Sequence, residues 1–119
     1  MERITVWLAL SDSCTADAWL SVVAHKDKPG YLLVRARHPN HITDNFPDVH
    51  MYVIDHADYP YRANIPSEEF GQFMHEYCTT MTYGNFKSSV KDYDFHHALN
   101  AVWRMMYQYG ENYRPEEDE

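Results

Sequence analysis

Three arginines, at positions 35, 37 and 62, are the residues whose type and spacing point most directly to chemistry. Arg35 and Arg37 are two positions apart in an apolar-rich run, and side chains two apart in a strand lie on the same face. Arg62 alternates with apolar neighbours in a later run. If the two strands are neighbours, the three guanidiniums form a cationic patch. Such a patch suits carboxylate or phosphate groups, because each guanidinium presents a fixed fork of donors.

The same arginines have a simpler interpretation. Asp55 and Asp58 lie close in sequence to Arg62, and the predicted helices carry further acids. Each arginine could pair with one of these as a solvated ion pair of little energetic consequence. Both interpretations stay open at the level of sequence.

Tyrosines near these arginines add a second kind of group. The chain has ten tyrosines, and Tyr59, Tyr61 and Tyr83 lie nearest the basic positions, which also include Lys87. Exposed tyrosines can stack on a base or anchor a protein partner. Together these side chains predict a site for an anionic, nucleotide-like ligand.

Histidine and glycine patterns offer little support for catalysis or a cofactor. The eight histidines include His38-x-x-His41, His50 with Asp55 and His56, and the adjacent pair at 96 and 97. None of these has the spacing of a zinc site with a second ligand pair. No Gly-x-Ser-x-Gly turn and no glycine-rich phosphate loop occurs. We therefore predict no catalytic residue, no metal and no cofactor.

Cys78 is the candidate nucleophile of a cysteine hydrolase only if His75 or His97 approaches it. Its position on the apolar stripe of a predicted helix instead predicts a buried thiol. A metal- or Cys-dependent hydrolase is accordingly the least favoured hypothesis.

Five strands are predicted to position these groups. Period-two alternation of apolar residues indicates strands over 4–10 and 20–24, and a turn at 26–30 leads into a third strand over 31–37. Two more are expected over 51–54 and 61–65, joined by the turn-prone segment 58–60.

Later in the chain, apolar residues recur at the intervals of three and four that are typical of helices. Asn40 is expected to cap a short helix closed by Pro47, and Ser67 to cap a helix with an apolar stripe over 70–81. A second stripe over 95–107 predicts a helix that stops at Gly110. Strands gathered first and helices last indicate an α+β, two-layer domain, with an antiparallel sheet of about five strands packed on C-terminal helices.

Composition sets the remaining expectations. The 119 residues, 45% of them hydrophobic, suit one domain over 1–110 followed by an acidic, disordered tail over 111–119. The net charge of −8 disfavours binding to duplex nucleic acid, which depends on basic side chains. Two cysteines, Cys14 and Cys78, are expected as free thiols, and the lack of a secretory signal or a long apolar run predicts a cytoplasmic protein without membrane association.

Four motifs in a fixed order carry a resemblance to known proteins. They are V-R-A-R at 34–37, D-Y-P-Y-R at 58–62, Y-G-N-F-K at 83–87 and V-W at 102–103. Over roughly residues 18 to 108 the chain resembles an uncharacterised family of small bacterial and phage-borne proteins. The resemblance implies that Arg35, Arg37, Asp58, Arg62, Asn85 and Lys87 occupy motif positions, and the phage membership suggests a host-defence antagonist.

Two functional hypotheses follow. The first is a non-enzymatic protein that binds an anionic small molecule through its Arg, Lys and Tyr side chains. The second is an acidic, anti-CRISPR-like inhibitor that covers a nucleic-acid-binding surface of a host protein. A homodimer is also expected, because an antiparallel sheet with an exposed edge readily self-associates.

Overall fold

The computed structural model describes residues 6–10, 17–81 and 93–115, the first of these as backbone only. The chain divides into two compact units, Met1–Tyr83 and Gly84–Glu119. The predicted division at residue 110 stays a prediction.

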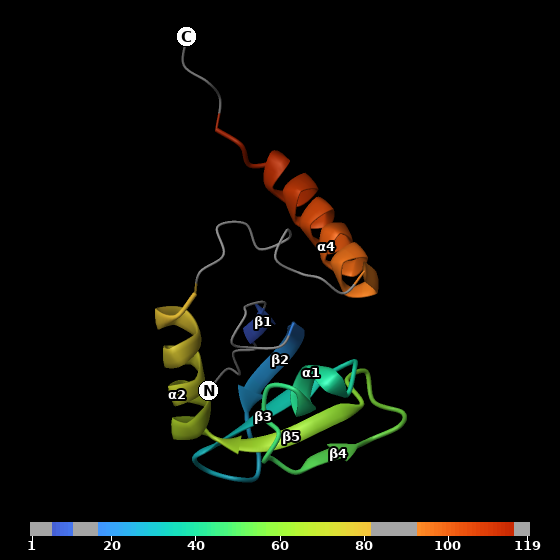
Figure 1. Ribbon diagram of the computed structural model, residues 1–119. Helices are drawn as coiled ribbons and strands as arrows, with labels where there is room; N and C mark the ends of the chain where they lie inside the picture. The colour runs from blue at the N-terminus through green and yellow to red at the C-terminus, as the bar shows by residue number, and fades with distance from the viewer. Residues whose placement is uncertain (1–5, 11–16, 82–92, 116–119) are drawn as a thin grey trace. The chain divides into compact units, whose positions relative to one another are not determined.

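An antiparallel sheet dominates the first unit (Figure 1). Its strands are β1 (Val6–Leu10), β2 (Ala18–Ala24), β3 (Tyr31–Ala36), β4 (Met51–Val53) and β5 (Tyr61–Pro66), in the spatial order β1-β2-β3-β5-β4. The β2–β3 turn contains Gly30, whose positive φ of 81° suits a residue without a Cβ. The expected α+β class and antiparallel sheet are confirmed.

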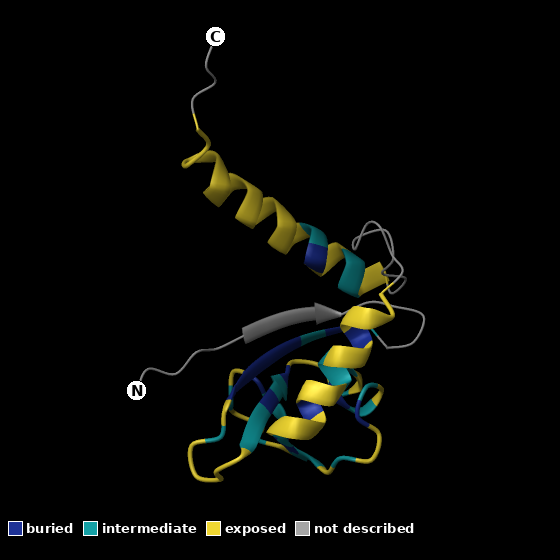
Figure 2. Ribbon diagram, turned by 90° about the vertical axis from the view of Figure 1, so that its left-hand side faces the viewer, coloured by how far each residue is buried: buried dark blue, intermediate teal, exposed yellow. Residues whose placement is uncertain are grey.

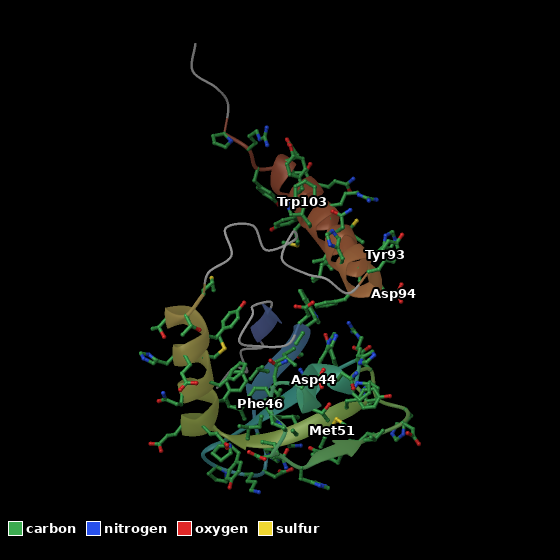
Figure 3. The ribbon with its side chains drawn as sticks, viewed as in Figure 1. Asp44, Phe46, Met51, Tyr93, Asp94 and Trp103 are labelled. Carbon is green, nitrogen blue, oxygen red and sulfur yellow. The ribbon has the colours of Figure 1, made fainter. Side chains whose placement is uncertain are left out.

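One face of the sheet, here called the inner face, forms the core. Alternate residues of β2, β3 and β5 meet there, and Leu20, Val34 and Ala63 are fully buried. Two helices, α1 (Asn40–Thr43) and α2 (Ser67–Thr79), pack on the same face, since Ile42, Phe46, Phe70 and Tyr77 belong to the same buried cluster. The rings of Phe46 and Phe73 lie 4.5 Å apart, and Phe46 points toward α2 (Figure 3).

Both predicted caps are corrected by the structure. Asn40 and Ser67 are the first helical residues, and the prolines before them hold the N-cap positions without a side-chain cap. The physical reason is clearest at α2, where β5 continues to Pro66 and leads directly into the helix. The Ser67 N–H donates to the Gly30 carbonyl at 2.9 Å, so this amide is satisfied by the neighbouring turn.

The predicted burial of Cys78 is also wrong. Tyr77 is buried, whereas Cys78 is an exposed free thiol, and α2 ends at Thr79. The stripe Phe70, Phe73, Met74 and Tyr77 already covers the inner face with two turns of helix. Cys78 therefore falls beyond the edge of the contact.

The second unit contains α4 (Tyr93–Glu111), which includes the predicted helix over 95–107. Most of its length is exposed (Figure 2). Leu99 is its one buried residue among those described. The predicted packing of this helix on the sheet stays a prediction.

Candidate functional site

Arg35 and Arg62 lie opposite each other on the outer face of the sheet. β3 and β5 are neighbours, and their antiparallel register pairs Arg35 directly with Arg62. In the same row Ser21 of β2 is opposite Arg35, and Tyr52 of β4 is opposite Arg62. Directly opposed residues have Cβ atoms about 5 Å apart. The sheet thus brings together two of the three arginines that the sequence singled out.

Each of these two arginines is held by a hydrogen bond to its surroundings. A terminal nitrogen of Arg35 donates to the Ser21 hydroxyl at 2.7 Å. Nε of Arg62 donates to the Tyr59 carbonyl at 3.0 Å. Ser21 is fully buried, so its hydroxyl is a fixed acceptor rather than a mobile surface group.

Arg37 completes the group from just beyond the end of β3. Its guanidinium carbon lies 4.1 Å from the centre of the Tyr59 ring, and that of Arg35 lies 5.2 Å from it. A terminal nitrogen of Arg37 also contacts both carboxylate oxygens of Asp58, at 3.1 and 3.2 Å. Because these side chains are 56% and 78% exposed, this ion pair adds little stability.

The arginine cluster, defined as Arg35, Arg37 and Arg62 around Tyr59, concentrates positive charge. Between residues 17 and 81 these are three of only five Lys and Arg residues, whereas nine Asp and Glu residues lie in the same stretch. Like charges placed directly opposite on a sheet destabilise it. An anion at the cluster would relieve this repulsion.

The three tyrosines predicted to stack on the ligand do not all lie at the arginine cluster. The Tyr59 ring is buried, with 9% exposure, and two guanidiniums contact it, so it positions the arginines rather than offering a free face. Tyr61 lies on the inner face and packs against the core. Tyr83, Asn85 and Lys87 lie outside the described residues.

Sequence reasoning missed the supporting role of Ser21. The strand alternation does place Ser21 opposite the apolar face of β2, and this was the available signal. Tyr52 and Asn64 were missed in the same way, and the Tyr52 hydroxyl donates to Oδ1 of Asn64 at 3.0 Å on the outer face.

The histidine pair at 38 and 41 has a local structural role. Nδ1 of His41 accepts a hydrogen bond from the Trp19 N–H at 3.1 Å, and Nδ1 of His38 accepts one from the Asn40 N–H at 3.1 Å. In the part of the chain that the structure describes, no group of three His, Cys, Asp or Glu side chains is arranged to hold a metal ion.

A groove that sequence reasoning did not anticipate lies on the helical side of the first unit. Its volume is about 270 Å³, and it runs between α2 and the segment after α1. Phe46, Phe73 and Val49 give it an apolar lining, and its acids are Asp48, Glu69 and Glu76. The first unit thus has a basic cluster on one face of the sheet and an acidic groove on the other.

Comparisons with family models, with curated proteins and with solved structures find no match to this chain. The family resemblance carried by the four motifs therefore stays a prediction. Among the helices of the described residues, none combines the length and the apolar character needed to span a bilayer.

Proposed function

We propose that the protein binds a small anion, of the phosphate or nucleotide type, at the arginine cluster. The observation that carries the proposal is the direct register pairing of Arg35 with Arg62, with Arg37 beside them on the ring of Tyr59. Like charges placed directly opposite each other destabilise a sheet, and a bound anion would offset this repulsion.

The anchoring contacts favour a binding role. Ser21 and the Tyr59 carbonyl each hold one guanidinium, and the Tyr59 ring supports two. Side chains fixed before the ligand arrives lose less conformational entropy on binding. Nε of Arg62 makes its hydrogen bond to Tyr59, and its two terminal nitrogens make no hydrogen bond to another described residue. They are the donors that the ligand would use.

The proposed ligand is a small cytoplasmic anion rather than duplex nucleic acid. Binding along a duplex requires many phosphate contacts from basic side chains. The net charge of −8 opposes such an approach, whereas three local cations suffice for one phosphate group.

Isothermal titration with pyrophosphate and with ADP tests this proposal. Arg62→Ala removes a charge-assisted donor that is worth about 1.5–3 kcal/mol, so we expect the Kd for both probes to rise roughly 10- to 100-fold. Lys28→Ala is the matched control, because it removes the same charge near the opposite end of β3, where the ammonium lies 4.1 Å from the centre of the Tyr31 ring. Equal losses in the two variants, or no loss in Arg62→Ala, would contradict the proposal.

A second candidate function is favoured by the acidic groove. Asp48, Glu69 and Glu76 surround the apolar residues Phe46 and Phe73, a combination that fits a basic segment carrying an apolar anchor. We propose as the alternative that the groove binds the nucleic-acid-binding surface of a host protein, as an antagonist of host defence would.

The affinity of the protein for a fluorescent peptide rich in Arg and Leu tests this alternative. Glu69→Gln and Glu76→Gln should weaken the peptide at least fivefold, on the order of 1 kcal/mol. Glu68→Gln is the control, since Glu68 lies on the same helix but does not line the groove. If the three variants weaken the peptide equally, the net charge of the helix is responsible and the groove is not a site.

A further inference from the structure

The second unit exposes an unusual amount of apolar surface for so short a segment. Several of its large side chains are between two-fifths and four-fifths exposed, and Figure 3 shows Tyr93 and Trp103 projecting from α4. The exposed set is Tyr93, Val102, Trp103, Met105, Met106, Tyr107, Tyr109 and Tyr113. At 100° per residue, these positions cover roughly 240° of the circumference, more than twice what one contact needs.

Part of this set follows the heptad repeat of a coiled coil. Apolar or aromatic residues recur at alternating intervals of four and three, which is the spacing of the a and d positions. The six positions are Phe95, Leu99, Val102, Met106, Tyr109 and Tyr113. A repeat of this kind makes a continuous seam along one side of a helix, and a second helix can pack into it.

The positions beside and opposite the seam fit self-association. The flanking positions are His96, Ala98, Trp103, Met105, Gly110 and Asn112, and none is an acid, a lysine or an arginine. Two identical helices can therefore approach without like-charge repulsion at the edges of the contact. The opposite side carries His97, Arg104 and Glu111, which suits a face in water.

Burial along the seam changes near its middle. Leu99 is 6% exposed, whereas Val102 is 41% and Met106 and Tyr109 are each 60% exposed. Tyr113, the last of the six positions, lies in the turn that directly follows the helix and is 72% exposed. The part of the seam from Val102 onward is therefore the part that needs a partner.

The exposed area is close to what a stable dimer requires. Taking about 200 Å² for each large side chain, the exposed fractions of those on or beside the seam leave on the order of 600 Å² per chain, from Trp103, Met105, Met106, Tyr109 and Tyr113. A standard specific interface buries about 800 Å² per partner.

We propose that α4 pairs with α4 of a second copy of this chain through the seam from Val102 to Tyr113. The pairing is antiparallel, because four consecutive acids at 116–119 follow the helix and a parallel pair would bring two such segments together. The homodimer is then made by the helix and not by the sheet edge.

Sedimentation equilibrium of the full chain at 1–100 µM tests the pairing. We expect a dimer in this range, and Met106→Glu should raise its Kd at least tenfold by placing a charge in the seam. Gln108→Glu is the matched control, because it adds the same charge on the polar side of the same helix two residues away. Tyr109→Glu repeats the test in case Met106→Glu lowers the helix content seen by circular dichroism.

Each outcome decides the matter. A monomer at 100 µM overturns the proposal, and a monomer whose thermal stability falls with Met106→Glu shows that the seam covers a surface of its own chain. Equal dissociation by Gln108→Glu would also overturn it. For orientation, Val102→Cys at one end of the seam should cross-link poorly to itself but readily to Tyr113→Cys at the other end, and the reverse result would contradict the antiparallel arrangement.

Discussion

The inner and outer faces of the sheet carry different side chains on alternate residues of the same strands. On β3, Val34 and Ala36 are buried in the core, while Arg35 between them faces outward against Arg62. On the inner face, α1 and α2 pack against the apolar side chains of the strands and complete the core. The outer face instead holds opposed cations. Alternate residues of a single strand can therefore build the core on one side and a charged surface on the other.

The largest effect is expected on the inner face. Ile42 is fully buried and anchors the four-residue helix α1 to the core, so Ile42→Ala should lower the free energy of unfolding by about 3 kcal/mol, within the usual cost of such truncations. Urea denaturation measures it. Val53→Ala, at a half-exposed position, should change stability by less than about 0.5 kcal/mol. Similar losses in both variants would remove the distinction between core and edge.

An intermediate effect is expected at Tyr59. Tyr59→Leu keeps an apolar side chain but removes the ring that contacts the guanidiniums of Arg35 and Arg37, so stability should fall by about 1–2 kcal/mol. Anion affinity should fall as well, because the arginines lose their support. Tyr93→Leu, which alters an exposed ring outside the seam, is the control. A stable Tyr59→Leu variant with unchanged affinity would mean that the ring does not organise the cluster.

The smallest effect is expected at the exposed ion pair. Asp58→Asn should change the free energy of unfolding by less than about 0.5 kcal/mol, because both partners are largely in water. The same change should tighten pyrophosphate binding two- to threefold at low salt, since it frees Arg37 and removes a competing carboxylate. Asp55→Asn removes an equal charge nearby, without a described contact to Arg37. A gain of the same size in Asp55→Asn would assign the effect to net charge alone.

Sequence reasoning identified the arginines but not their arrangement. Alternation along β3 and β5 correctly placed Arg35 and Arg62 opposite the apolar side chains. Their direct pairing depends on β5 lying between β3 and β4, and on a register that is set by long-range contacts. Neither is encoded in a local pattern.

Local patterns failed where two elements meet without a loop. Ser67 has the composition of a cap, yet β5 runs directly into α2 and Pro66 takes that position. Cys78 continues a helical stripe in the sequence, but the sheet surface that the stripe covers ends before it. The burial of Tyr59 was likewise not predictable, because it depends on arginines from another strand.

The most direct test of the anion site is a titration of the arginine side chains by NMR. The Nε–Hε signals of the full chain are followed as pyrophosphate is added, with Arg104 and Arg114 of the second unit as internal controls. We predict that the signals of Arg35, Arg37 and Arg62 shift together with one Kd while those of Arg104 and Arg114 stay in place. Equal shifts at all arginines, or none at Arg35 and Arg62, would contradict a binding site on the outer face.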